Sequence, residues 1–270
     1  DFITDQQGLR TSNMKKIKSN TKENIFLFGD SFTFGVGLNY NDTYAGIIEN
    51  KLQNYNFYNF AVGSYSPTVH LHRFQKALEN KIIPKKIFLF LDLTDVIDES
   101  QRWVNDKNLN IPIRPEKKKK GKNFFQKNFK FSVELSTLIK SNVRAIKKKY
   151  LSNKNDKIEI KTSIQGQFTY TPKDKLNKIF WKKGDFSKGI GKIEKNIKKI
   201  SEITKLNNTE FYIVVYPWAE TLEYGQQEFS WSNFANSLCK KYHCKTIDTI
   251  PAFNRYKSQN INWSSDLYFI

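Results

Sequence analysis

An aspartate and a serine, side chains that can act as acid or base and as nucleophile, stand just after a short apolar run near the start of the chain. The stretch from Ile25 to Gly37 is I-F-L-F-G-D-S-F-T-F-G-V-G, so Gly29, Asp30 and Ser31 follow a predicted buried strand. A serine in such a turn commonly caps the next helix, but it can also be a nucleophile, and the backbone of the turn can bind a phosphate. The lysine and the glycine spacing of a P-loop are missing. Taken alone, the motif favours an ordinary capped turn.

The residues that follow favour the nucleophile. Gly-Asp-Ser-Phe-Thr-Phe-Gly after a first strand closely resembles the nucleophile block of the SGNH (GDSL) hydrolase superfamily. The resemblance implies a flavodoxin-like three-layer α/β/α sandwich in which Ser31 attacks an ester or acetyl carbonyl. We expect Asp30 to fix the nucleophile turn through hydrogen bonds rather than to take part in the chemistry.

A second block of this family supplies a backbone N–H to the oxyanion hole, normally from a glycine. Here the second strand ends in N-F-A-V-G-S-Y-S-P, from Asn59 to Pro67, and Ser64 stands where that glycine usually does, with Gly63 beside it. A backbone N–H survives a change from glycine to serine. The resemblance therefore assigns two oxyanion donors to the N–H groups of Ser31 and Ser64.

The third block of the family is Gly-x-Asn-Asp, whose asparagine is the remaining oxyanion donor. The third strand ends in L-D-L-T-D-V-I-D-E, so Asp92 takes the glycine position, Thr94 the asparagine position, and Asp95 matches the aspartate. The resemblance makes Thr94 the third donor and Asp95 a supporting residue. A threonine hydroxyl can donate but is shorter, and losing one good oxyanion donor costs about 3 to 4 kcal/mol of transition-state stabilisation.

A general base for the serine is not evident. The histidines are His70, His72 and His243, and none stands in the Asp-x-His or Asp-x-x-His block that the family places late in the chain. We interpret the first two as polar helix positions and the third as part of a turn. The chain ends in N-W-S-S-D-L-Y-F-I, an aromatic run that in relatives leads into the histidine block. The expectation is that this block and the last helix lie beyond Ile270.

The apolar runs between these motifs predict an α/β sheet. The predicted strands are Ile25–Phe28, Phe57–Ala61, Lys86–Leu91, Glu210–Tyr216 and Lys245–Ile247. The predicted helices are Thr43–Leu52, Pro67–Leu78 with Ser66 as N-cap, Phe131–Tyr150, Lys188–Lys205 and Trp231–Tyr242. Continuous apolar strands alternating with helices indicate a parallel sheet of about five strands covered on both faces. Residues 1–270 are predicted to form a single domain, with an N-terminal arm over 1–20 and a basic insertion over 100–185.

Composition adds a partner class. Lys and Arg outnumber Asp and Glu by 45 to 26, a formal charge of +19, which attracts polyanions, although solvated lysine-rich helix faces explain such an excess better. The densest lysine cluster, 117–122, lies in the insertion and could hold an anionic polymer beside the site. No zinc spacing or nucleic-acid-binding pattern accompanies it, so neither a metal or cofactor nor nucleic acid is expected. Cys239 and Cys244 form either a disulfide, in an oxidising compartment, or two free thiols.

Two functions follow, from different classes. The first is an esterase or O-acyltransferase. The Ser-Tyr-Ser-Pro stretch, the Asp-Leu-Thr-Asp-Val-Ile-Asp-Glu stretch and Tyr216-Pro217-Trp218 resemble an SGNH-like subgroup associated with bacterial cell-surface polysaccharide. That resemblance implies an acylated carbohydrate substrate and a periplasmic or extracytoplasmic protein. A membrane anchor upstream of Asp1 is an open alternative. A small acyl ester or lipid remains an open alternative. The second function is a non-catalytic module that binds an anionic glycan or an assembly partner, which the Asp92 and Thr94 departures and the absent base favour.

Overall fold

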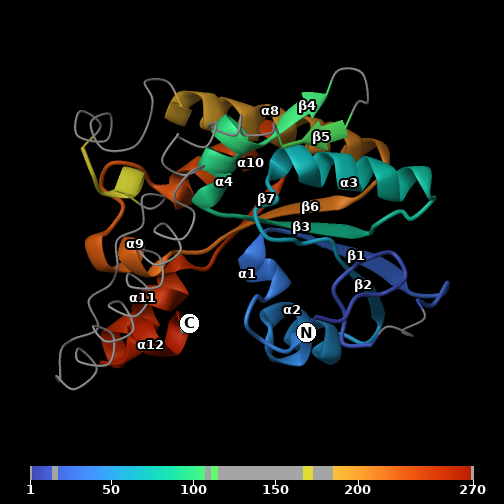
Figure 1. The fold of residues 1–270 in the computed structure, drawn as a ribbon, viewed down its shortest axis with the longest axis horizontal. Coiled ribbons are helices and arrows are strands. Elements are labelled where there is room, and N and C mark those ends of the chain that lie inside the picture. The colour runs from blue at the N-terminus through green and yellow to red at the C-terminus, as the bar shows by residue number, and fades with distance from the viewer. Residues whose placement is uncertain (1, 14–17, 107–110, 115–166, 173–184, 269–270) are drawn as a thin grey trace, which may run out of the picture. The chain divides into compact units, whose positions relative to one another are not determined.

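A five-stranded parallel sheet carries the fold (Figure 1). The computed structural model describes residues 2–13, 18–106, 111–114, 167–172 and 185–268, all within one compact unit. The strands are β1 (Glu23–Phe28), β2 (Tyr55–Asn59), β3 (Lys86–Leu91), β6 (Glu210–Val215) and β7 (Lys245–Asp248). Their order in the sheet is β2-β1-β3-β6-β7, which is the flavodoxin-like order 2-1-3-4-5 when the sheet strands alone are numbered.

Helices cover both faces of this sheet, so the predicted three-layer α/β/α class is confirmed. Because side chains alternate along a strand, Phe26 and Phe28 pack on one face, while Ile25 and Leu27 pack on the other. The first face is covered by α3 (Pro67–Glu79), α8 (Asp185–Leu206) and α10 (Trp231–Tyr242). The second is covered by α1 (Ser31–Phe34), the 3₁₀ turn η1 (Tyr40–Asp42) and α2 (Tyr44–Lys51). Figure 1 shows these two sets on opposite sides of the strands.

Short elements extend the ends of the strands. After β3 come α4 (Thr94–Ile97), the π-helical turn η2 (Asp98–Arg102) and the antiparallel pair β4 (Val104–Asp106) and β5 (Ile111–Ile113). The 3₁₀ turn η3 (Gln167–Thr169) precedes α8, and α9 (Ala219–Tyr224) follows β6. Helices α11 (Ile250–Gln259) and α12 (Trp263–Leu267) follow β7. Each helix among the described residues is too short or too polar to cross a bilayer.

The predicted elements agree with these bounds to within about three residues at each end where they are described. One detail differs: Ser66 occupies the N-cap of α3, but its hydroxyl donates to Glu99 and makes no cap hydrogen bond. The predicted helix Phe131–Tyr150 and the lysine cluster 117–122 lie outside the described residues. The domain organisation, including the basic insertion over 100–185, therefore stays a prediction.

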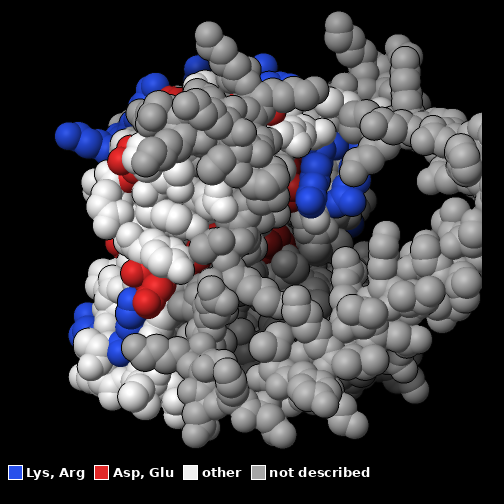
Figure 2. Space-filling model, turned by 60° about the vertical axis from the view of Figure 1, so that its left-hand side comes forward, with Lys and Arg blue, Asp and Glu red and all other residues white. Residues whose placement is uncertain are grey.

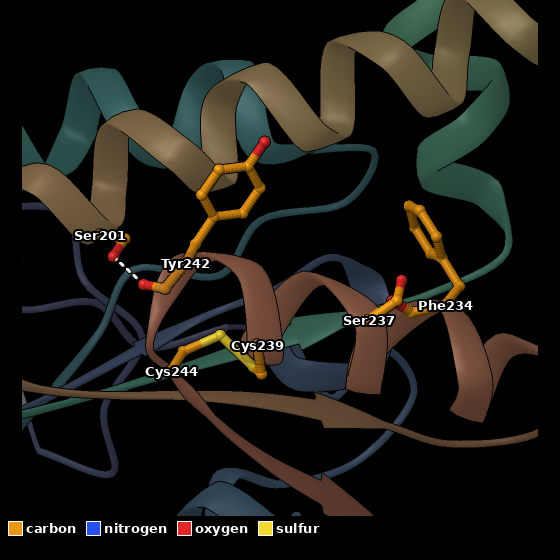
Figure 3. The surroundings of a disulfide bond; sticks show 6 residues. All are labelled: Ser201, Phe234, Ser237, Cys239, Tyr242 and Cys244. Carbon is orange, nitrogen blue, oxygen red and sulfur yellow. Dashed lines mark hydrogen bonds between the residues drawn. A yellow bond between two sulfur atoms is a disulfide. The ribbon is translucent and has the colours of Figure 1, made fainter.

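A disulfide resolves the open alternative for the two cysteines (Figure 3). Cys239 lies in the last turn of α10, and Cys244 directly precedes β7. The helix ends at His243, whose φ of 58° is left-handed, and the N–H of Cys244 donates to the carbonyl of Cys239 at 3.1 Å. The hydroxyl of Ser201 on α8 donates to the carbonyl of Tyr242. The covalent bond therefore closes a turn that backbone hydrogen bonds already define.

Candidate active site

The predicted site residues meet at the topological switch point of the sheet. Strands β1 and β3 are neighbours, and the chain leaves them toward opposite faces, which leaves a crevice at their carboxyl ends. A cavity of about 90 Å³ lies there. Its lining residues are Asp30, Ser31, Ser64, Thr94, Ile97, Asp98, Arg102 and Trp218. Ser31, Ser64 and Thr94, which follow three different strands, thus share one cavity.

The nucleophile turn is held by its own residues. Asp30 is the N-cap of α1, and its Oδ1 accepts the N–H of Phe32 at 2.9 Å, as expected from the sequence. The Ser31 hydroxyl donates to Asp30 Oδ2 at 3.3 Å. Gly29 is required because a Cβ there would lie 2.0 Å from Thr33 Oγ1 and 2.6 Å from Thr33 Cβ, far below the sum of the van der Waals radii. These contacts set Ser31 at the mouth of β1.

The turn after β2 brings Ser64 to the same place. A Cβ added to Gly63 would lie 3.9 Å from Ser31 Cβ, so this turn packs against the nucleophile. Ser64 has a φ of 62°, a left-handed conformation that glycine adopts most readily. Two donors stabilise the strained turn: Arg102 Nη1 reaches Ser64 Oγ at 2.9 Å, and Trp103 Nε1 reaches the Ser64 carbonyl at 2.7 Å.

Two backbone donors at this cavity are unused. Neither the N–H of Ser31 nor that of Ser64 makes a hydrogen bond to any described residue. Both residues line the cavity, and an unpaired N–H in such a position is costly unless water or a ligand accepts from it. A carbonyl oxygen that becomes an oxyanion is such an acceptor.

Thr94 differs from this pattern. Its backbone N–H and its hydroxyl both donate to Oδ1 of Asp92. A hydroxyl has one hydrogen, so while it points at Asp92 it offers only lone pairs to the cavity. Asp95, the predicted supporting residue, is buried, and its Oδ2 accepts the N–H of Asp92 at 2.9 Å. The two aspartates thus fix the turn in a reciprocal arrangement like a capping box, and the donor role of Thr94 stays a prediction.

Asp30 and Asp92 are joined beneath the cavity by one hydroxyl. Tyr216 Oη lies 3.3 Å from Asp30 Oδ1 and 3.3 Å from Asp92 Oδ2, and Trp218 Nε1 donates to the same Asp92 oxygen at 2.8 Å. The tyrosine has one hydrogen for two carboxylates. The second contact is therefore favourable only if a carboxyl group carries a proton.

Burial explains why this pair keeps a proton. It raises the pKa of Asp30 to about 7, with the charge of Asp92 as the second cause, and burial also raises the pKa of Asp92. Asp98, in the same cavity, has its pKa raised to about 7 by burial, although the Arg102 guanidinium at 3.0 Å opposes the shift. The described residues contain no group of His, Cys, Asp and Glu arranged to hold a metal. With pKa values of about 7, the Asp30 and Asp98 carboxyls are partly protonated at neutral pH.

Known structures resemble this chain only weakly. No family model matches it, and no curated protein does. The SGNH-hydrolase family esterase AlinE4 has a TM-score of 0.42 at 14% identity, over 85% of this chain and 77% of that one. A putative lipolytic protein of the G-D-S-L family from Desulfitobacterium hafniense DCB-2 has a TM-score of 0.41 at 13% identity, over 85% and 77%. A catalytic mutant of Axe2, an acetylxylan esterase from Geobacillus stearothermophilus, has a TM-score of 0.40 at 10% identity, over 90% and 84%. At such values the function has to be inferred from the residues of this chain.

None of the three histidines lines the cavity. His70 is fully buried on α3, so the expectation of a polar helix position is wrong, and burial lowers its pKa to about 3. Its ring nitrogens have no hydrogen-bond partner among the described residues. His72 lies elsewhere on α3, and His243 ends α10. A general base for Ser31 is therefore not supplied by a described histidine.

The sequence motifs missed Arg102, Asp98 and Ile97 as cavity residues. Asp98 lies within the stretch that carried Thr94, and its place on the first turn of η2 brings it beside Arg102. A π-helical turn is uncommon and is often found at functional sites. No sequence pattern indicates a π-helical turn at Asp98–Arg102, and the position of Arg102 depends on that turn, so it could not be predicted.

A buried carboxylate anchors this segment. Glu99 is fully buried and accepts from Ser66 Oγ at 2.8 Å, from the Thr68 N–H at 2.6 Å and from Thr68 Oγ1 at 2.6 Å. Lys192 of α8 pairs with it at 3.2 Å and donates to the Glu99 and Trp103 carbonyls at 2.7 Å each. The network ties η2 to the start of α3 and to α8. It thereby holds the segment that contacts Ser64.

Among the described residues drawn in Figure 2, cationic side chains do not form one continuous patch. The described Lys and Arg residues there stand in small groups, several of them beside acidic side chains. Ion pairs in the described chain include Lys241 with Glu194 at 2.7 Å and Lys257 with Glu223 at 2.9 Å. An anionic polymer bound to the insertion stays a prediction.

Proposed function

We propose that this protein is a serine esterase or O-acyltransferase of the SGNH type. One observation carries the proposal: Ser31, at the end of β1, shares a cavity with Ser64, and the backbone N–H groups of both residues lack a partner among the described residues. A nucleophilic hydroxyl beside two unused backbone donors is the minimal arrangement for acyl transfer.

The chemistry follows from these groups. Ser31 Oγ attacks the acyl carbonyl carbon, and the carbonyl oxygen becomes an oxyanion that accepts from the Ser31 and Ser64 N–H groups. Collapse expels the alcohol and leaves an acyl-serine, which water or an acceptor hydroxyl then cleaves. A general base must take the Ser31 proton. The family resemblance assigns this role to a histidine, and no described histidine lines the cavity.

The proposed substrate is an acetyl ester of a cell-surface carbohydrate. A cavity of about 90 Å³ suits a short acyl group better than a long chain. The disulfide between Cys239 and Cys244 supports a periplasmic or other extracytoplasmic location, because disulfides persist in oxidising compartments.

Hydrolysis of p-nitrophenyl acetate by the full-length protein tests the proposal. We expect Ser31→Ala to reduce the rate to the background because the nucleophile is lost. The matched control is Ser237→Ala. Ser237 is an exposed serine on α10 whose hydroxyl donates to the Phe234 carbonyl, so its replacement should leave the rate unchanged. Equal rates for wild type and Ser31→Ala would exclude Ser31 chemistry on acetyl esters.

A second candidate is a non-catalytic module that binds a glycan or an assembly partner. The Thr94 contact favours it, because Asp92 accepts both donors of the residue at the family's third oxyanion position. This candidate predicts glycan binding that Ser31→Ala does not alter, together with no acetyl ester hydrolysis by either protein.

A further inference from the structure

A larger cavity lies along helix α3 and shares no lining residue with the cavity at Ser31. Its volume is about 570 Å³, within the range of small-molecule sites. The α3 groove, as we call it, has a wall of two kinds of side chain. Phe60, Tyr65 and Trp103 are aromatic, and His72, Arg73 and Lys76 are basic. Figure 1 shows the β4–β5 hairpin beside α3.

The groove is suited to a negative charge. None of its described lining residues is an aspartate or glutamate. The Arg73 guanidinium makes no hydrogen bond or ion pair with the described residues and lies 5.4 Å from the ring centroid of Phe60. Its donors are thus held beside a ring and left free, and a carboxylate can accept two of them at once.

Two other basic residues differ in charge. Lys76 carries a positive charge and forms an ion pair with exposed Glu79, with 2.7 Å between its Nζ and the Glu79 Oε2. Burial, and then the charge of Lys76, lowers the pKa of His72, so His72 is neutral at neutral pH. Among the lining residues, the positive charge therefore comes from Arg73 and Lys76, and the Arg114 guanidinium, 4.9 Å from the ring centroid of Trp103, lies close to the same wall.

One turn separates the groove from the cavity at Ser31. Ser64 lines that cavity, and the next residue, Tyr65, lines the groove. Trp103 packs edge-to-face on Tyr65, with ring centroids 5.8 Å apart, and donates to the Ser64 carbonyl. A chain-like ligand could therefore reach both cavities by crossing this single turn.

We propose that the α3 groove binds a carboxylated sugar unit, with its carboxylate on Arg73 and Lys76 and its ring beside Tyr65 and Trp103. The unpaired guanidinium fits a planar carboxylate, which can accept two of its N–H groups at once, and the aromatic wall favours a ring over an extended side chain. The inference deepens the proposed function and rests on it for one point: the acyl ester that meets Ser31 belongs to the same glycan. The substrate class is then an acylated acidic glycan.

Calorimetric titration of full-length Ser31→Ala with a short oligogalacturonate tests the groove without turnover. We expect binding that weakens as salt rises. Adding Arg73→Gln should weaken it roughly ten- to hundred-fold, the usual loss of a charge-assisted hydrogen bond. Lys198→Gln removes the same charge from exposed α8 and should change nothing. Thermal unfolding of each variant shows that it is folded.

Three outcomes would overturn the inference: no binding of oligogalacturonate, equal binding after Arg73→Gln, or tighter binding of oligoglutamate, which would indicate a peptide site. The two proposals can fail separately. Acetyl ester hydrolysis without glycan binding removes the groove assignment and leaves the esterase. Glycan binding sensitive to Arg73→Gln without hydrolysis removes the esterase and leaves the groove.

Discussion

Asp30 holds a proton that an exposed aspartate would release, and its surroundings explain why. The carboxyl is buried at the base of the nucleophile turn, and Asp92 is reached through the same tyrosine hydroxyl. Each ionised carboxylate would repel the other in a medium that screens charge poorly. The raised pKa of about 7 therefore means that ionising Asp30 lowers the free energy of unfolding.

This cost predicts how stability depends on pH. The unfolded chain releases the Asp30 proton near its ordinary pKa of 3.8, whereas the folded protein retains it until about 7. The contribution to stability is therefore complete at low pH, is lost as pH rises through that window, and stays lost above it. Asp30→Asn is neutral throughout, so it should be more stable than wild type at pH 8, by about 4 kcal/mol at most.

Urea unfolding of both proteins at several pH values measures this difference. The two stability curves should lie closest near pH 4 and separate as pH rises. Parallel curves would show that Asp30 titrates normally in the folded protein.

At the same scale, the sequence predicted which residues meet but not all of their contacts. Ser31 and Ser64 could be placed because each follows a strand whose carboxyl end lies at one edge of the sheet. The hydrogen bonds between Thr94 and Asp92 could not be predicted from the sequence. A threonine hydroxyl next to both a carboxylate and a cavity can donate to either one, and the sequence does not say which. Arg102 depends on an irregular turn for which no residue pattern is diagnostic.

At the scale of elements, Glu99 links three segments that are distant in sequence. It lies in η2, accepts from the first turn of α3 and pairs with Lys192 of α8. A carboxylate at a helix N-terminus also interacts favourably with the helix dipole. The segment that holds Ser64 through Arg102 and Trp103 is thereby attached to two helices.

Glu99→Gln should be costly because it removes the charge from a buried, fully paired carboxylate and leaves Lys192 with two carbonyl acceptors but no ion-pair partner. We expect a loss of about 3 kcal/mol in the free energy of unfolding. Glu194→Gln is the matched control, because the Lys241 side chain that it pairs with is 63% exposed, and it should cost less than about 1 kcal/mol. Chemical denaturation of the two variants distinguishes them, and similar losses would remove the anchoring role of Glu99.

The elements themselves were largely predictable. Ile87–Leu91 is a continuous apolar run in the middle of the sheet, and the predicted bounds Lys86–Leu91 match β3. Trp231–Tyr242 has helical spacing and forms α10. The β4–β5 hairpin was not predicted, because two strands of three residues each carry too little periodicity to be recognised.

For the molecule as a whole, the disulfide fixes the passage from α10 to β7. Replacing Cys239 and Cys244 with alanine frees a closed loop of only a few residues in the unfolded chain. The loop-entropy relation then gives a loss of about 2 kcal/mol. Urea unfolding of the double variant measures it, and adding reductant to wild type should produce the same loss. A reductant that leaves wild type unchanged while thiol titration finds two free cysteines would contradict the bond.

The order of strands has a kinetic consequence. Ser31, Ser64 and Thr94 follow β1, β2 and β3, and whole helices separate these strands along the chain. Parallel pairing of this kind closes long loops before any contact is gained, so it is slow compared with helix formation. The helices can therefore regain their circular dichroism signal early in refolding while the site does not yet exist. The rate at which Ser31 regains its reactivity toward an acyl ester would therefore measure how fast β1, β2 and β3 pair in the native register.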